Sequence, residues 1–281
     1  MPEDVADRLR ALSALPGVSE AAEAAREACT RLRFVEALRR RTAEAAAESR
    51  IRGAQASARL EGADLPLDLV RDLVRGAAPW SSEPDPVERV VRGAVQATAE
   101  TEHTVGVVQS APLQALARLH VAAMASQLPA DQVGRPRTGS EESRELVDLG
   151  PAPPAGQVPD RLAGLVPLVS GSSGVPAVVV AGLVHAEIAT VRPFVRGNGV
   201  VARAMQRALV QALGLDPTGV AVVEVGHLES GGAAYLGALQ AYGTGTRDGV
   251  ALWLRHCAEA VVVGVEEGMR VCAAVQVGRL G

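Results

Sequence analysis

The chain has 281 residues, 48% of them hydrophobic, with a net charge of −4 at pH 7 and a pI near 5.8. This length and apolar content can bury a large core, and the charge balance gives no general attraction to nucleic acid or anionic membranes. Three distant cysteines without CxxC spacing indicate reduced thiols rather than a disulfide framework or a zinc site.

The chain shows no targeting signal, and we expect a cytoplasmic protein with no membrane or nucleic-acid partner. Its N-terminal residues are charged and lack the apolar run of a secretory signal. The longest apolar stretch, 175–191, contains His185 and Glu187 and falls short of the roughly 20 residues that a membrane span needs.

The N-terminal half is rich in Ala, Glu, Arg and Leu and is predicted to be helical. Gly62 ends or redirects the first long helix, and residues 76–86 form a loop because Gly, Pro and Ser interrupt the pattern there. The predicted helices of this half are 19–59, 65–74, 87–99 and 113–128.

Composition changes sharply at residues 129–159, which are rich in Gly, Pro, Arg and Glu. We expect an exposed loop there. Polar and apolar residues alternate over 144–149, so a small β-hairpin is a further expectation for this loop.

The C-terminal half returns to helical patterns, and Pro176 suits the opening of a helix because its backbone dihedral is fixed. A second helix starts near Val200, with apolar positions that recur every four residues. The predicted helices are 162–169, 176–191, 200–213, 228–242 and 250–265. The sequence therefore predicts an all-α fold without internal repeats.

The segment with the most chemical content is RPFVRGNGVVAR, residues 192–203. A helix ends, glycines turn the backbone, and the next helix directs unpaired N–H groups and its positive dipole end at one spot. Arg192, Arg196 and Arg203 add positive charge, so a phosphate fits this cradle. The alternative is a plain turn between helices with arginines in solvent.

This stretch resembles the Fic (Fido) family signature HPFx(D/E)GNGRxxR in order and spacing. The matching residues are Pro193, Phe194, Gly197, Asn198, Gly199 and Arg203. The resemblance implies a helical Fic core, a protein that binds ATP or another nucleotide, and AMP transfer to protein targets (AMPylation). It also implies a protein partner or target and a homodimer.

A second resemblance lies upstream, at SARLEG, residues 57–62. It matches the inhibitory motif (S/T)xxxE(G/N) of Fic proteins whose autoinhibitory helix precedes the core, with Ser57, Glu61 and Gly62 at the motif positions. In that class the glutamate pairs with the second arginine of the signature, so we expect Glu61 to pair with Arg203.

The resemblance covers roughly residues 50–265. We therefore divide the chain into an N-terminal helical segment (1–50), a Fic-like domain (51–265) that includes the inhibitory helix, and a C-terminal tail (266–281).

Three departures from the signature fall on its chemistry. Arg192 stands where the family has its general base, a histidine, and a guanidinium cannot accept a proton at working pH. Arg196 replaces the acid that holds Mg²⁺ and would repel the metal, so no metal site is predicted. Val200 replaces the first signature arginine. Ordinary AMP transfer is therefore not expected.

No other histidine is placed to serve as the base. His185 lies seven residues before Arg192, about 10 Å along a helix, which is too far for direct proton transfer. We expect it to be a packed or capping residue. The remaining four, His103, His120, His227 and His256, are also expected to be structural.

Two functions remain open. The first is a catalytically impaired regulatory or nucleotide-binding pseudoenzyme that uses a former target-docking flap, residues 134–150, to hold a partner. The second is an active nucleotidyl- or phosphoryl-type transferase with rewired, metal-independent chemistry, in which Arg196 neutralises phosphate and Glu61 is a working brake. The Glu61 and Arg203 pair could equally persist as a structural tie between helices.

Overall fold

The structure, a computed structural model, describes residues 2–145 and 147–278. Within these residues it contains helices and no strand, which confirms the all-α prediction. The α-helices are α1 (Pro2–Ser13), α2 (Val18–Arg33), α3 (Thr42–Leu60), α4 (Leu67–Arg75), α5 (Pro86–Thr104), α6 (Pro112–Met124), α7 (Val158–Ser170), α8 (Ala177–Val191), α9 (Asn198–Ala212), α10 (Val223–Glu229), α11 (Gly232–Gly243) and α12 (Arg247–Gln276). Three short 3₁₀ turns, η1 (Glu36–Arg39), η2 (Ala130–Gln132) and η3 (Ala155–Gln157), lie between them.

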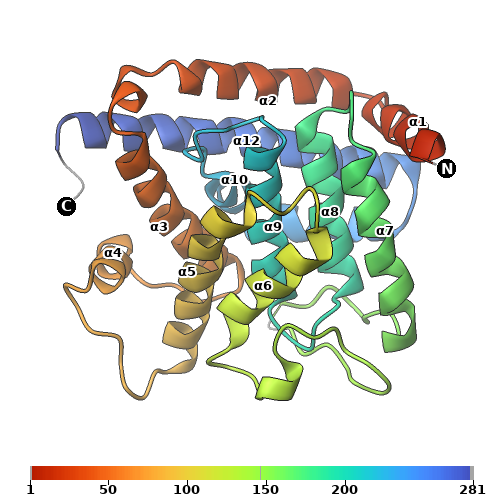
Figure 1. The fold of residues 1–281 in the computed structure, drawn as a ribbon, viewed down its shortest axis with the longest axis horizontal. Helices are drawn as coiled ribbons and strands as arrows, with labels where there is room; N and C mark the ends of the chain where they lie inside the picture. Colours follow the sequence, from red (N-terminus) through yellow and green to blue (C-terminus); the bar gives the residue numbers. More distant parts are fainter. Residues whose placement is uncertain (1, 146, 279–281) are drawn as a thin grey trace.

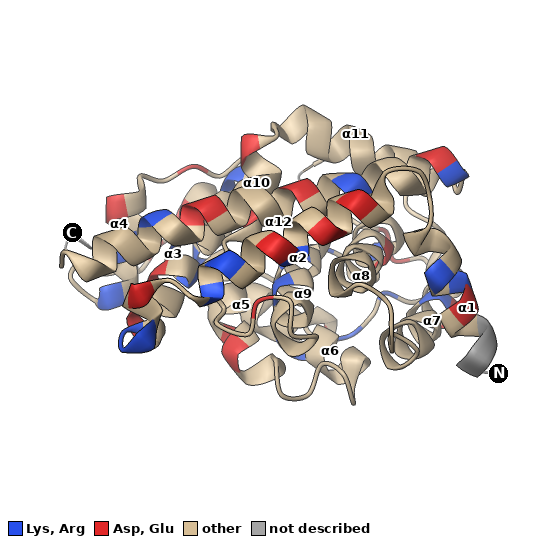
Figure 2. Ribbon diagram, turned by 90° about the horizontal axis from the view of Figure 1, so that it is seen from above, with Lys and Arg blue, Asp and Glu red and all other residues tan. Residues whose placement is uncertain are grey.

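Two helices form the centre of the molecule. Helices α8 and α9 pack side by side and are buried along almost their whole lengths (Figure 1). Helices α3, α5 and α6 pack on the side of α9, and α7 packs against α8. The long helix α12 runs behind them beside α2 (Figures 1 and 2). None of the described helices combines the length and apolarity needed to cross a bilayer.

Aromatic residues make up only 2% of the chain. The contacts between helices are therefore made mainly by small side chains, which let the helices approach closely. The clearest case is Gly226 in α10, which lies against the backbone of α12. A Cβ at Gly226 would stand 2.0 Å from the carbonyl oxygen of Ala260. The contact between α10 and α12 therefore depends on this glycine.

The predicted helix 19–59 is two helices. Helix α2 ends at Arg33, the chain turns through η1, and α3 starts at Thr42. No Pro or Gly marks the break in the sequence. Helix α2 packs on α12 whereas α3 packs on α5 and α10, so tertiary packing of the two apolar faces overrides a uniform helical propensity. The predicted domain boundary at residue 50 falls inside α3.

The C-terminal predictions also change. The helix predicted over 228–242 is two helices, α10 and α11, because Ser230 and Gly231 interrupt it. The segment predicted as a tail from residue 266 belongs to α12 as far as Gln276 and buries Val271 and Val275. Residues 279–281 lie outside the described residues.

The expected hairpin at 144–149 does not form among its described residues, and residue 146 lies outside them. The backbone here bonds elsewhere: the amide of Arg144 donates to the carbonyl of Val195 at 2.6 Å. The flap is thus bonded to the turn between α8 and α9 and forms no hairpin among its described residues.

Replacing Gly226 with alanine is expected to lower the free energy of unfolding by roughly 1–3 kcal/mol, because the new methyl group must displace the backbone of α12. Urea-induced unfolding followed by circular dichroism measures this. The matched control is Gly237→Ala in α11, where the added Cβ meets nothing within 4 Å. It should stabilise the protein by up to about 1 kcal/mol, and equal losses in both variants would contradict the packing argument.

Candidate functional site

The turn between α8 and α9 forms the cradle, defined here as the backbone of residues 197–199 at the start of α9. Helix α8 ends with Arg192 in the left-handed region (φ 48°), the one non-glycine residue with positive φ in the described ranges. Gly197 (φ 85°) is the N-cap of α9, and glycine adopts this conformation without steric cost. The N–H groups of α9 therefore start directly after a tight, buried turn.

Asn198 holds the turn in shape. Its side-chain oxygen accepts a hydrogen bond from the Phe194 amide at 2.8 Å, and its Nδ2 donates to the Phe194 carbonyl at 2.8 Å. The side chain is fully buried. A residue of this size with both a donor and an acceptor is what the turn requires.

His120 of α6 packs against the turn and bonds to it. Its ring stacks on Phe194 with centroids 3.8 Å apart. The Gly134 amide donates to Nδ1 at 2.8 Å, so Nε2 carries the proton and donates to the Arg196 carbonyl at 3.0 Å. Burial lowers the pKa of His120 to about 4, which keeps the ring neutral. His120 is structural, as predicted.

The flap caps the C-terminal end of α8 with a positive charge. Arg137, which is buried, donates from Nε to the Arg192 carbonyl at 2.7 Å and from NH2 to the Val191 carbonyl at 3.1 Å. The Arg137 amide also donates to the Pro193 carbonyl at 2.7 Å. A cation is favourable here because the free carbonyls of a helix end carry partial negative charge.

The flap caps the N-terminal end of α9 with a negative charge. The Glu145 carboxylate accepts from the amides of Gly197 (3.2 Å) and Asn198 (2.9 Å), and also from Asn198 Nδ2. Burial and the nearby charge of Glu61 raise the pKa of Glu145 despite these bonds. The protein's own carboxylate thus occupies the position that an anionic ligand would take.

Arg203 of α9 is fully engaged inside the protein. It donates from NH2 to Glu61 Oε1 at 2.6 Å and to the Ser57 carbonyl at 3.0 Å, from Nε to Ser57 Oγ at 2.8 Å, and from NH1 to the Tyr235 hydroxyl at 3.2 Å. Burial alone would lower the pKa of Arg203, but Tyr235 and Glu61 outweigh it and raise that pKa. The predicted ion pair is therefore present.

Two glycines place the Glu61 carboxylate. Gly62 (φ 83°) follows Glu61, the C-cap of α3, and the amides of Gly62 and Ala63 bond back to the carbonyls of Arg59 and Ala58. This helix ending leaves Glu61 in the final turn, facing α9. A Cβ at Gly199 would lie 2.3 Å from Glu61 Oε1, so only glycine there leaves the Glu61 carboxylate in its place on Arg203.

Little space remains at the cradle. Glu61, Glu145, Arg203 and Tyr235 surround a cavity of about 20 Å³ together with apolar residues of the flap and α11. This is room for about one water molecule. A nucleotide does not fit the cradle in this conformation and would need Glu145 and Glu61 to move.

The substituted signature positions have different surroundings. Arg192 is buried and donates from NH1 to the Gly150 carbonyl at 2.7 Å. Burial lowers the pKa of Arg192. Val200 is buried in the core. Arg196 is half-exposed, does not line the cavity, and its side chain has no bonding partner within the described ranges.

A buried histidine cluster lies behind Arg203. His185 bonds to the Tyr235 hydroxyl (2.8 Å) and to Gln206 Oε1 (2.6 Å), and His227 bonds to the same Gln206 oxygen (2.8 Å) and to His256 (3.0 Å). Burial lowers the pKa of His185 to about 3 and that of His256 to about 4, and it lowers the pKa of His227 well below its usual value. These rings are neutral core groups, which agrees with the structural role predicted for them.

The structure brings together Ser57, Glu61, Asn198, Gly199 and Arg203 but leaves Arg196 outside the cavity. Sequence reasoning missed Arg137 and Glu145 as partners of the turn. Both lie more than 50 residues from the groups they bond, and the only available signal was the density of Arg and Glu in the flap.

Residues 110–210 match the family model described as Fic/DOC family. The fold is similar to that of a Fic family protein from Desulfovibrio desulfuricans, with a TM-score of 0.72 and 22% identity over 91% of this chain and 74% of that one. It is also similar to Fic-1 from C. elegans (TM-score 0.67, 17% identity, 98% and 83% coverage). A Fic-domain-containing signaling protein from Bacteroides thetaiotaomicron gives a TM-score of 0.56, 12% identity, and 97% and 98% coverage. No curated protein matches the sequence.

The histidine cluster should make stability fall in mild acid. The folded pKa values of these histidines lie below the unfolded value of about 6.5, so the unfolded chain binds more protons. The contribution of the neutral, buried histidines to stability is therefore fully present above about pH 6.5 and is lost as the pH falls. Between pH 7.5 and 5.5 the unfolding free energy of His256→Gln should fall by roughly 1 kcal/mol less than that of wild type, because the folded pKa of His256 is about 4. Urea titrations at both pH values test this. His103→Gln, an exposed site, should behave like wild type, and a slope unchanged by His256→Gln would refute the assignment.

Proposed function

We propose, from the Fic/DOC-family domain that this chain contains, that the protein is a regulatory or nucleotide-binding Fic-fold protein in which ordinary AMP transfer is impaired. The observation that carries the proposal is Arg192. Its guanidinium stands where the resemblance expects the general base, and a guanidinium cannot accept a proton. Loss of a general base typically lowers a rate by about 10²- to 10⁴-fold.

The surroundings of the cradle favour a metal-independent site. The carboxylates beside it, Glu61 and Glu145, are already bonded to Arg203 and to the amides of α9. Arg196 stands where the signature has an acid. Within the residues that the structure describes, no group of three or more His, Cys, Asp or Glu side chains is arranged to hold a metal ion. We therefore expect no Mg²⁺ site among the residues at the cradle in this conformation.

We further propose that Glu61 and Glu145 compete with phosphate. Glu145 takes the amides that would bind an anion, and Glu61 takes the arginine. Nucleotide entry then requires both glutamates to move. The flap bears the exposed residues Gly139, Ser140, Glu142 and Arg144, which offer a surface to a protein partner, and such a partner would lift Glu145 if it moved the flap.

The alternative is an active transferase that moves a nucleotidyl or phosphoryl group to a protein hydroxyl. One feature of the geometry favours it: the Glu145 carboxylate lies at the start of α9, 2.9 Å from the Asn198 amide, and burial and the charge of Glu61 raise its pKa. A carboxylate with a raised pKa is suited to general base catalysis near neutral pH. Glu61 would then be the brake on this activity.

Removal of the two glutamates is expected to open the cradle to ATP. By calorimetry, the double variant Glu61→Gly, Glu145→Gln should bind ATP at least about tenfold more tightly than wild type, equally with and without Mg²⁺, because charge-assisted bonds to phosphate replace internal ones. Glu224→Gln is the matched control, since it breaks another buried pair of α9, with Arg207 at 2.8 Å. Equal affinity in wild type and double variant would contradict competition, and no binding in any variant would restrict the protein to an interaction module.

Transfer is tested with ATP labelled on the α- or γ-phosphate and a lysate as the source of targets. We expect no protein labelling by wild type or by Glu61→Gly, because no base of the ordinary kind is present. The opposite result would be labelling of protein by Glu61→Gly that disappears in the double variant Glu61→Gly, Glu145→Gln. It would overturn the proposal of impaired transfer and establish the active transferase.

A further inference from the structure

The hydrogen-bond partners of Arg203 come from two different parts of the fold. Three of its four bonds go to α3 and its C-cap, namely to the Ser57 hydroxyl, the Ser57 carbonyl and the Glu61 carboxylate. The fourth goes from NH1 to the Tyr235 hydroxyl of α11 at 3.2 Å. Among the described residues, Tyr235 is therefore the one hydrogen-bond partner of Arg203 that does not depend on α3.

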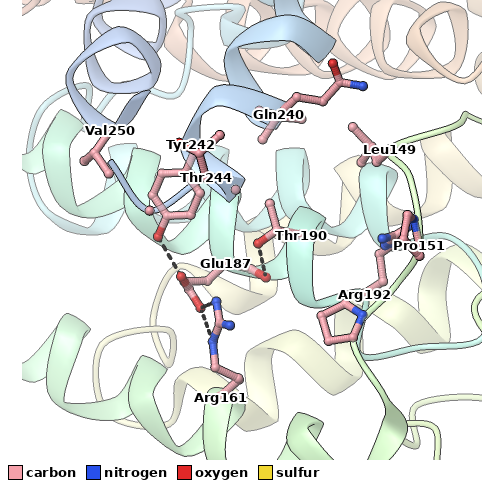
Figure 3. Close-up of a pocket in the computed structure, with 14 residues that line it drawn as sticks. Leu149, Pro151, Arg161, Glu187, Thr190, Arg192, Gln240, Tyr242, Thr244 and Val250 are labelled. Carbon is pink, nitrogen blue, oxygen red and sulfur yellow. Dashed lines mark hydrogen bonds and ion pairs between the residues drawn. The ribbon is translucent and has the colours of Figure 1, made fainter. Parts of the chain in front are cut away.

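Helix α11, which carries Tyr235, is attached to the core independently of α3. It packs on α12 and α8. Tyr242, near its end, donates to Glu187 of α8 at 2.6 Å, and Arg161 of α7 bonds the same carboxylate at 2.7 Å (Figure 3). A movement of α3 that takes Glu61 out of the cavity therefore need not displace Tyr235.

Tyr235 holds the part of the guanidinium that lies beside the cradle. A Cβ at Gly199 would stand 3.3 Å from Arg203 NH1, the nitrogen that bonds to Tyr235. The Tyr235 ring adds a second attraction, because its centroid is 5.8 Å from Arg203 Cζ, within the reach of a cation–π contact. Departure of Glu61 would thus free NH2 for a phosphate while NH1 stays held.

Tyr235 can hold Arg203 only through its oxygen lone pairs, because a guanidinium only donates hydrogen bonds. Burial raises the pKa of Tyr235 to about 12, although Arg203 acts in the opposite direction, so the hydroxyl keeps its proton at neutral pH. This proton needs an acceptor other than Arg203. His185 Nε2 lies 2.8 Å from the hydroxyl oxygen, and its tautomer decides whether it accepts.

Gln206 fixes the tautomer of His185. Burial lowers the pKa of His185 to about 3, so the ring is neutral and carries one N–H. Nδ1 lies 2.6 Å from Gln206 Oε1, an oxygen that can only accept, so Nδ1 carries the proton. Nε2 is then an acceptor, and the Tyr235 hydroxyl donates to it. The lone pairs of Tyr235 are left for Arg203.

The rest of the histidine cluster keeps the Gln206 oxygen in place. Gln206 follows Arg203 by three residues on α9, so both side chains lie on the same face, and Gln206 is buried. His227 Nε2 donates to the same oxygen at 2.8 Å, and its other nitrogen accepts from His256 Nε2 at 3.0 Å. Two donors therefore converge on one buried oxygen, which keeps it facing His185.

We propose that Tyr235 is the positioning residue of Arg203, and that His185 keeps the Tyr235 oxygen available to the guanidinium. When Glu61 leaves the cavity, Tyr235 holds the guanidinium beside the cradle, ready for a phosphate. The inference rests on the proposed function, in which Arg203 receives phosphate, and it gives the buried histidine cluster a role besides packing.

The positioning is measured without nucleotide, by NMR relaxation of the Arg203 Nε–H group, whose signal is assigned with Arg203→Lys. The background is Ser57→Ala, Glu61→Gly, which removes both side-chain contacts with α3. There we expect an order parameter of about 0.85, and adding Tyr235→Phe should lower it below about 0.6. In otherwise wild-type protein Tyr235→Phe should leave Arg203 ordered. An order parameter that is the same with and without Tyr235→Phe in the background would overturn the proposal.

The role of His185 is tested in the same background. His185→Leu removes the acceptor of the Tyr235 proton and should lower the order parameter of Arg203 as Tyr235→Phe does. His185→Gln should restore it, because an amide oxygen can accept that proton. His256→Gln, which alters the same cluster but keeps a donor for His227, is the control and should leave Arg203 ordered. Equal loss in His185→Gln and His256→Gln would show a merely structural cluster and would overturn the role of His185.

ATP affinity connects the positioning to the proposed function. By calorimetry, Tyr235→Phe should weaken ATP binding at least about fivefold when added to Glu61→Gly, Glu145→Gln, whereas His256→Gln should not weaken it. Equally tight binding with and without Tyr235→Phe would overturn the positioning role and leave the proposed function intact. Absence of ATP binding in the double variant would contradict the proposed function, while the order parameter of Arg203 would still decide the positioning role.

Discussion

Two helix ends of opposite polarity meet inside the protein, and the rest of the site depends on satisfying them. The carbonyls at the end of α8 and the amides at the start of α9 are separated by a buried turn, where water cannot serve as the partner. The flap supplies both partners, Arg137 to the carbonyls and Glu145 to the amides. The charges match the helix dipoles. One segment thereby closes the turn, bonds the amides at the start of α9 and lines the cavity.

Buried arginines hold helix α3 against this turn. Arg203 and Arg207 lie one turn apart on α9 and bond Ser57 and Ser49 of α3 as well as their glutamates. Breaking such a buried pair costs roughly 3–5 kcal/mol because one charge is left alone. The Arg207 pair lies away from the cavity at the cradle, whereas the Arg203 pair makes similar contacts beside it. The two pairs differ in position rather than in bonding.

The sequence was sufficient for most helices, for the turn at 192–199 and for the contact between Glu61 and Arg203, because each depends on local pattern or a spaced motif. It did not reveal the break between α2 and α3, which is decided by packing on two different helices. It also missed Glu145 as the occupant of the cradle. An exposed loop with several glutamates offers no local sign of which one reaches a helix end that follows 53 residues later. The bonding of Arg192 to a flap carbonyl was hidden for the same reason.

The hydrogen bonds between the flap and the turn also determine how the site can open. The amides of Arg137 and Arg144 donate to the turn, while those of Gly197 and Asn198 donate to the flap. Because these hydrogen bonds run in both directions between the flap and the turn, movement of the flap away from the turn would break them together. The four amides should therefore exchange with solvent deuterium as one cooperative unit, at a rate set by a single local opening free energy. We therefore expect access to the cradle to depend on movement of the flap as a unit rather than on a gradual loosening of separate contacts.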